Sequence, residues 1–346
     1  MHRVTIAQLM QETGLSRATI DRVINKRGKV HPRTLQVVQS SLEKLSQTSQ
    51  LPTLHSDLNA DLVSRVGHGM MMQLLQVWNE IKPNGQFHDM YQATDEQVLK
   101  VVEQLCKDLS KPLIITAKNN NRLVNVLKGA RAKGKRVITL ISDLSWQARD
   151  CFVGIDNRAA GLTAAFLIGR MLGHHPTSVG LVLGHLSFHC HEDREIGFRT
   201  CLRSKFPKVM LLGEAQGEDS TELTRKAVLE MLKENPSLGA IYNVGGGNTG
   251  LAAALKAANR HHDILVVGHE VNAVTSPLLQ EGVLDFVIAS DPCALLKHAL
   301  ELANEAELNA QREQQLLDFG VYTRFNLPNF AENTHTASSS KSTPAI

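Results

Sequence analysis

LIITAKNNNRLVNVLKGARAKGKRVITLI, residues 113–141, contains a complete strand–helix–strand unit. Leu113–Thr116 and Val137–Ile141 are short apolar runs rich in β-branched residues, which is typical of buried strands. Leu123–Lys133 lies between them and has the apolar spacing of a helix. Two such strands joined by one helix predict a parallel pair with a crossover connection.

The same alternation continues from about residue 61 to about residue 322. Further strands are predicted at Val179–Leu183, Ala240–Tyr242 and Ile264–Val267. Further helices are predicted at Glu96–Asp108, Arg158–Leu172, Thr221–Glu234 and Thr249–Asn259. A chain of 346 residues is too long for one ordinary domain. We therefore predict an α/β core of two doubly wound parallel-sheet lobes over residues 60–330.

Ligands of doubly wound sheets bind outside the carboxyl ends of the strands. Polar residues that directly follow the apolar runs are therefore the candidate binding residues. They are Asp143, Arg194, Asn243, Glu270 and Asp291.

The N-terminal segment TIAQLMQETGLSRATIDRVINKRGKVHPRTLQVVQSSLEKL, residues 5–45, has a different pattern. Three short helices are predicted in it, with Thr5 capping the first and Ser16 capping the second, Arg17–Asn25. Two helices joined by a tight turn, the second of them basic, suit the DNA major groove. This pattern predicts an all-α helix-turn-helix headpiece over residues 1–46. A small three-helix bundle with no DNA role is the alternative.

Several residues of the headpiece are suited to DNA contacts. Arg17 can donate two hydrogen bonds to guanine, and Ala18 is small enough to touch a thymine methyl group. Thr19 and Arg22 can bind phosphates or bases. The predicted backbone-phosphate contacts are Thr5, Ser16, Asn25, His31 and Thr34.

Charge and composition agree with this division. Residues 1–50 contain eight Lys or Arg and three Asp or Glu, although the net charge of the chain is only +3. Such asymmetry fits a nucleic-acid-binding end, with an ordinary basic surface patch as the alternative. The five cysteines are scattered and form no Cys-x-x-Cys pair, and we see no signal peptide or membrane span. We therefore expect a cytoplasmic protein that does not contact a membrane.

Two N-terminal stretches, VTIAQLMQETGLSRATIDRVIN (4–25) and GKVHPRTLQVV (28–38), closely resemble the headpiece of the lactose-repressor (LacI) family of transcription regulators. Asp21 departs from the serine usual in that family. VGIDNRAAG (153–161), HEDREIGF (191–198) and YNVGGGNTG (242–250) resemble the core of the family. That core is similar to periplasmic sugar-binding proteins: two lobes, three crossovers and a small ligand in the cleft.

The resemblance implies a set of effector contacts. Arg194 stands where the family has an arginine that anchors a sugar, and Glu270 stands where relatives usually have aspartate. Asp143 and Asp291 are further contacts at strand ends. His68, Met70 and Met71 are expected to line the first strand–helix loop. Residues 47–59 read as a linker without the family's hinge-helix motif, and residues 331–346 as a disordered tail.

A rival function follows from one motif. Gly245, Gly247 and Gly250 match G-x-G-x-x-G between a strand and a helix, which would indicate an NAD-dependent oxidoreductase. The motif lies late in the chain, and the glycines equally fit a turn lining a sugar cleft. His189, Cys190 and His191, with histidines upstream, could suggest a metal, but their spacing fits no usual metal site.

These observations predict a DNA-binding transcription regulator, more specifically a repressor. A sugar, polyol or sugar acid between the core lobes would control its affinity for a DNA operator through allostery. Two headpieces on a homodimer would read two half-sites. We find no catalytic constellation, so no enzyme is predicted, and neither a cofactor nor a metal is expected.

Overall fold

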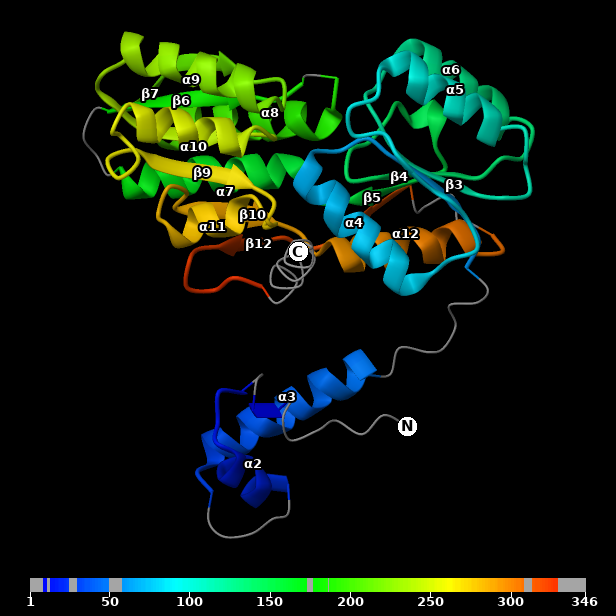
Figure 1. Ribbon diagram of the computed structural model, residues 1–346, viewed down its shortest axis with the longest axis horizontal. Coiled ribbons are helices and arrows are strands. Elements are labelled where there is room, and N and C mark those ends of the chain that lie inside the picture. The colour runs from blue at the N-terminus through cyan, green and yellow to red at the C-terminus, as the bar shows by residue number, and fades with distance from the viewer. Residues whose placement is uncertain are drawn as a thin grey trace, which may run out of the picture. The chain divides into compact units, whose positions relative to one another are not determined.

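The computed structural model describes residues 9–10, 13–24, 30–49, 58–172, 177–185, 187–307 and 313–328. The chain divides into two compact units, Met1–Asp57 and Leu58–Ile346 (Figure 1). The described part of the smaller unit is helical, and the larger unit contains both sheets.

Two helices, α2 (Arg17–Ile24) and α3 (Pro32–Ser49), make up most of the described part of the smaller unit. Its buried cluster comprises Leu9, Ile20, Val23 and Val38. Ser16 Oγ accepts a hydrogen bond from the Thr19 N–H at 3.3 Å, so Ser16 caps α2. Helix α3 continues through residues 47–49 of the predicted linker. Residues 50–57 and the predicted first cap, Thr5, lie outside the described residues.

Lobe 1 of the larger unit is built on a six-stranded sheet with the order β11-β5-β4-β3-β1-β2. All neighbouring strands in it are parallel. The strands are β1 (Asp61–Ser64), β2 (Phe87–Asp89), β3 (Leu113–Thr116), β4 (Val137–Leu140), β5 (Cys151–Gly154) and β11 (Gln314–Leu316). The helices are α4 (His68–Ile81), α5 (Asp95–Leu105), α6 (Asn121–Arg131), the short η1 (Trp146–Ala148) and α12 (Pro292–Asn304).

Lobe 2 repeats this architecture with the strand order β12-β10-β9-β8-β6-β7, in which only β12 runs antiparallel to its neighbour. The strands are β6 (Thr177–Leu183), β7 (Val209–Gln216), β8 (Leu238–Asn243), β9 (Leu265–His269), β10 (Phe286–Ala289) and β12 (Gly320–Tyr322). The helices are α7 (Asn157–Met171), α8 (His189–Lys205), α9 (Thr221–Glu234), α10 (Asn248–Ala257) and α11 (Thr275–Gln280). The predicted core of two doubly wound lobes is therefore confirmed.

The chain passes between the lobes three times. It crosses from β5 to α7, returns from β10 to α12, and crosses again between β11 and β12. Helix α12 thus packs in lobe 1 although it follows a strand of lobe 2 (Figure 1). Because of these crossovers, each lobe is assembled from segments that are far apart in sequence.

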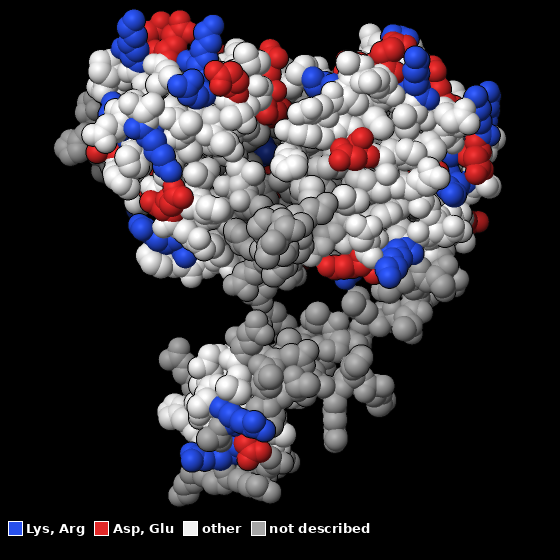
Figure 2. Space-filling view, in the orientation of Figure 1, with Lys and Arg blue, Asp and Glu red and all other residues white. Residues whose placement is uncertain are grey.

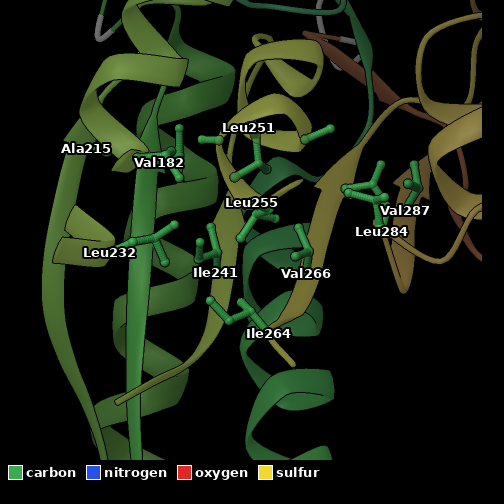
Figure 3. Packing of buried hydrophobic residues seen from close by; sticks show 14 of the residues in the cluster. Val182, Ala215, Leu232, Ile241, Leu251, Leu255, Ile264, Val266, Leu284 and Val287 are labelled. Atoms are coloured by element: carbon green, nitrogen blue, oxygen red, sulfur yellow. The ribbon is translucent and has the colours of Figure 1, made fainter. Parts of the chain in front are cut away.

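Helices cover both faces of each sheet, which explains why the central strands are mostly apolar and buried, whereas the edge strands β2, β7 and β11 are partly exposed. In lobe 2, one face is covered by α7 and α8 and the other by α9, α10 and α11. Figure 3 shows the second of these layers, where Leu251 and Leu255 of α10 lie against Ile241 and Val266 of the sheet. This packing holds the strand ends, and the loops that follow them, in place.

Lys135 is a buried charge that the hydrophobic pattern does not reveal. Its side chain is among the most buried in the protein, and burial lowers its pKa. The ammonium group donates to the backbone oxygens of Leu105, Asp108 and Lys111 at 2.8, 2.6 and 2.5 Å. It therefore ties the loop after α5 to the start of β3.

Lys135→Met is expected to lower the free energy of unfolding by at least about 1.5–3 kcal/mol, because the substitution leaves buried carbonyl groups without their charged donor. Urea unfolding followed by circular dichroism measures this loss. Lys133→Met is the matched control, since Lys133 is exposed. Equal unfolding midpoints for the two variants would contradict the structural role of Lys135.

Candidate functional site

A cavity of about 240 Å³ lies between the two lobes. Lobe 1 contributes Val66, Gly67, His68, Gly69, Met70, Tyr91, Thr116, Ile141 and Ser142. Lobe 2 contributes residues of α8, of the loop after β7, of the turn Gly245–Asn248 and of the loop after β9. These segments follow the carboxyl ends of strands, which is where doubly wound sheets bind their ligands.

Arg194 of α8 forms part of the cavity wall that lobe 2 contributes. It is 4% exposed, and its guanidinium donates to Asn157 Oδ1 at 2.8 Å and to the Val244 carbonyl at 3.0 Å. A third bond, from Nη2, reaches Glu270 Oε1 at 3.2 Å. Burial raises the pKa of Glu270, while Arg194 opposes that rise. The result is a fixed donor–acceptor pair at the cavity wall.

A second pair of charged groups lies beside the first. His191 Nδ1 is 3.8 Å from Asp219 Oδ2, and Asp219 also accepts from the Gly246 and His185 N–H groups at 2.6 and 3.2 Å. Burial alone would raise the pKa of Asp219, but His191 and these N–H groups outweigh it and lower that pKa. Burial alone would lower the pKa of His191, but Cys190 and Asp219 raise it.

The loop that presents Asp219 has an unusual backbone. Glu218 and Asp219 have φ values of 49° and 61°, in the left-handed region that residues other than glycine seldom adopt. Backbone strain of this kind clusters at binding sites. Here it accompanies an Asp219 carboxylate that reaches Gly246 of the neighbouring loop.

The glycine-rich turn after β8 also belongs to the cavity wall. Asn243 fastens this turn, because its Nδ2 donates to the Gly246 carbonyl at 2.8 Å and to Asn248 Oδ1 at 2.9 Å. Gly247 has a φ of 76°, and a Cβ there would lie 2.1 Å from Thr224 Oγ1. These glycines serve close packing at the start of α10, and nothing in their surroundings supports the dinucleotide alternative.

Aromatic rings line the cavity from both lobes. Tyr91 and His68 of lobe 1 are in ring contact at 5.4 Å between centroids, and Phe188 of lobe 2 contacts His191 at 5.5 Å. The lobes also approach closely at Gly69, where a Cβ would lie 2.4 Å from the Asn272 side chain. The cavity therefore offers apolar ring surface together with polar groups.

Half of the predicted effector residues meet at this cavity. His68, Met70, Arg194 and Glu270 line it. Met71 is buried in the protein interior, and Asn243 supports the cavity wall from behind. The structure therefore brings together residues of the first strand–helix loop and the α8 arginine, as the sequence suggested.

Asp143 and Asp291 do not line the cavity. Asp143 binds Arg149 through both carboxylate oxygens, at 2.9 and 2.8 Å. Asp291 caps α12 by accepting from the N–H groups of Cys293 and Ala294. Both carboxylates follow strand ends as predicted, but each is used for local structure.

Several other residues that line the cavity were not predicted from the sequence. They include Tyr91, Phe188, His191, Asp219, Asn248 and Asn272. Asn272 lies two residues after Glu270, so the loop after β9 could have been considered as a whole. Asp219 follows β7, which begins with the apolar run Val209–Leu212, so the same strand-end rule could have pointed to it.

The predicted DNA contacts lie in the smaller unit. Arg17, Arg22 and His31 are exposed, as is Ser16, whereas Thr19 and Thr34 are half-buried. Thr5 and Asn25 lie outside the described residues, and the side chain of Ala18 is likewise not described.

Among the described residues, no group of three or more His, Cys, Asp or Glu side chains is arranged to hold a metal ion. His189 and His191 instead contact different partners, Asn119 and Asp219. Within the same residues, no helix is long and apolar enough to cross a membrane.

Comparison with known families finds that residues 77–310 match the periplasmic binding protein domain family. Comparison with curated proteins finds no match.

Solved structures with the same fold are described as sugar-binding proteins. GanP, a glucose-galactose binding protein from Geobacillus stearothermophilus, is 17% identical with a TM-score of 0.71, covering 79% of this chain and 99% of its own. A transporter solute-binding protein from Burkholderia graminis, in complex with D-arabinose, is 18% identical with a TM-score of 0.71, covering 80% and 99%. Another from Agrobacterium vitis, with bound D-fucose, is 17% identical with a TM-score of 0.70, covering 80% and 98%.

These comparisons correct several predictions. The matched family and the structures of the same fold are solute-binding proteins, so the prediction of a DNA-binding repressor with an operator and a homodimeric partner is wrong. The NAD-dependent alternative is not supported either. The cytoplasmic assignment is also wrong, because the family is one of periplasmic proteins. The prediction that the protein is not an enzyme is confirmed, since the family and these structures are non-enzymatic binders.

Proposed function

Because this chain belongs to the periplasmic binding protein family, we propose that it binds a small neutral sugar in the cavity between its two lobes. The main support for this proposal is the Arg194–Glu270 ion pair, which lies at the wall of a cavity of about 240 Å³. Ligand pockets usually measure about 300–1,000 Å³, so this cavity suits a single small ligand.

The polar groups of the cavity match the chemistry of hydroxyl groups. A hydroxyl both donates and accepts hydrogen bonds, and Arg194 beside Glu270 presents one donor and one acceptor side by side. Asp219 and Asn248 add further oxygen and amide groups. The rings of Tyr91 and Phe188 supply apolar surface for the C–H faces of a sugar.

The charges of the cavity favour a neutral ligand. Arg194 faces Glu270 at 3.2 Å, and Asp219 faces His191 at 3.8 Å, so each charge already has an opposite partner. An additional buried charge on the ligand would lack one and would be costly to desolvate. In Figure 2, blue and red side chains are interspersed on both lobes rather than gathered as one sign.

The N-terminal segment is proposed as a separate small helical headpiece. Its compact unit spans Met1–Asp57, and α2 and α3 surround an apolar cluster of their own. The domain division of headpiece 1–46, linker 47–59, core 60–330 and tail 331–346 remains our proposal.

Isothermal titration calorimetry of the full chain tests the proposed ligand class. D-Glucose, D-galactose, D-arabinose, D-allose and D-fucose form the neutral panel, and D-glucuronate and D-galacturonate form the matched acidic panel. We expect at least one neutral sugar to bind, and both acids to bind at least about 100-fold more weakly than it does, the factor for roughly 2.7 kcal/mol of unpaired charge. Tighter binding of the acids would overturn the neutral assignment, and heat from no sugar in either panel would overturn the function.

A further inference from the structure

Hydrogen bonds beside the cavity join the two lobes directly. The backbone N–H of Asn119, in the loop after β3 of lobe 1, donates to the Ser187 carbonyl of lobe 2 at 2.7 Å. The side-chain Nδ2 of Asn119 lies 2.9 Å from His189 Nε2, at the start of α8. We call Asn119 and Ser145 of lobe 1, with Ser187 and His189 of lobe 2, the Asn119 latch.

The orientation of the Asn119 amide follows from its other partner. The Ser145 backbone N–H can only donate, and it points at Asn119 Oδ1 at 3.1 Å. The amide oxygen is therefore on the Ser145 side, and the NH₂ group faces His189. An NH₂ group only donates, so His189 Nε2 must accept, which requires a neutral ring with its proton on Nδ1.

From this geometry we propose that the Asn119 latch is a pH-sensitive contact that holds the cleft closed only while His189 is neutral. Protonation places an N–H on Nε2, opposite the NH₂ of Asn119, and the hydrogen bond is lost. Turning the amide over would let its NH₂ donate to Ser145 Oγ, which lies 3.3 Å from Asn119 Oδ1, but it would also set that NH₂ against the Ser145 N–H and lose the bond that this N–H now donates.

Several ionisable side chains lie near His189. The ionisable side chains that line the adjoining cavity with it are Asp143, Asp156, Arg158, Cys190 and Asp193. Asp143 is paired with Arg149 and Asp193 with Arg158, while Asp156 caps α7. The three carboxylates on this side thus already have partners of their own.

The sign of the pH effect follows from proton counting. The closed latch requires an unprotonated Nε2, so the closed state binds fewer protons than the open state, and acid favours opening. Histidine is the side chain that ordinarily changes charge between about pH 5 and 8. If the cavity binds a sugar as proposed above, protonation of His189 therefore weakens its retention.

The opposite flank of the cleft provides an internal comparison. There, Gln73 Nε2 of α4 donates to the Val271 carbonyl of lobe 2 at 2.8 Å. Neither group titrates, so this contact has no pH dependence of its own. Of these two inter-lobe hydrogen-bond contacts, only the Asn119 latch contains a histidine.

Hydrogen exchange of the ligand-free full chain tests the latch. The Asn119 amide bonds across the lobes, so its protection, corrected for the intrinsic exchange rate, reports opening. From about pH 7.5 to about pH 5.5 we expect a roughly threefold to tenfold loss of protection in the wild type, the factor that one hydrogen bond represents. The Val124 amide, which bonds within lobe 1 to Asn120, is the reference and should not change.

Two variants make the test specific to His189. Glutamine retains an acceptor near the position of Nε2 but does not titrate, so His189→Gln should keep Asn119 protected at both pH values. His189→Ala removes the acceptor and should leave Asn119 poorly protected at both. A wild type and His189→Gln that respond alike to pH, or a His189→Ala variant with wild-type protection, would overturn the proposal. Because no sugar is present, these outcomes are independent of the calorimetric test of function.

Discussion

Arg194→Ala is expected to abolish sugar binding and to lower the stability of the protein. Each lost hydrogen bond from a charged donor costs about 1.5–3 kcal/mol, which corresponds to an affinity at least about 100-fold weaker when more than one is affected. The truncation also leaves the Glu270 carboxylate and the Val244 carbonyl without the hydrogen bonds that Arg194 donates to them. Breaking a buried ion pair in this way typically costs about 3–5 kcal/mol of folding free energy.

Calorimetry with the best sugar of the neutral panel and urea unfolding measure the two effects. Arg158→Ala is the matched control, because Arg158 pairs with Asp193 on the surface at 3.0 Å and its side chain is 57% exposed. A surface pair of this kind contributes at most about 1 kcal/mol. If Arg194→Ala binds the sugar as tightly as Arg158→Ala does, the Arg194–Glu270 pair is not the binding element.

Gly161→Ala is expected to cost several kcal/mol of stability and to displace Arg194. Helices α7 and α8 cross so closely that a Cβ on Gly161 would lie 2.0 Å from the Arg194 backbone oxygen. Gly197 of α8 is equally close, with a Cβ there lying 2.1 Å from the Arg158 carbonyl. Backbone atoms cannot turn aside as a side chain can, so the helices must separate. Overpacking usually costs about 1–3 kcal/mol, and a backbone clash on this scale lies at or above that range.

Gly129→Ala is the control for Gly161→Ala. Gly129 lies within α6, and a Cβ added there meets no heavy atom within 4 Å. Alanine is a better helix former than glycine by about 0.8–1.0 kcal/mol, so this variant should be as stable as the wild type or more stable. Thermal unfolding of both variants, with calorimetry of sugar binding, checks the comparison. Similar behaviour of the two alanine variants would show that the α7–α8 crossing tolerates separation.

The N-terminal segment shows what local pattern cannot decide. Residues 5–45 carry the apolar spacing and caps of short helices, and α2 begins at Arg17 as that pattern predicts. The same pattern suggested a DNA-binding regulator, which the family and the structures of the same fold contradict. Local helix signals specify conformation, whereas function depends on the site that the whole fold assembles.

Both Glu270 and Asp143 follow strand ends, but only Glu270 lines the cavity, and the backbone explains the difference. Ile141, the residue directly after β4, has a φ of 68°, a conformation that β-branched residues rarely adopt. After this turn, Ser142 lines the cavity, while Asp143 bonds to Arg149. The left-handed backbone at Ile141 thus accompanies a change in which residue lines the cavity, and the residue types in this segment do not indicate it.

The sequence by itself determined the two α/β lobes, because apolar periodicity is local and parallel strands buried on both faces must be apolar throughout. It also pointed to Arg194 and His68. Only the tertiary structure decided that Asp219, His191 and Asn272 would join them. These residues follow different strands and meet because three crossovers and a left-handed loop bring the strand ends to one cleft, an arrangement that depends on contacts between segments far apart in the chain.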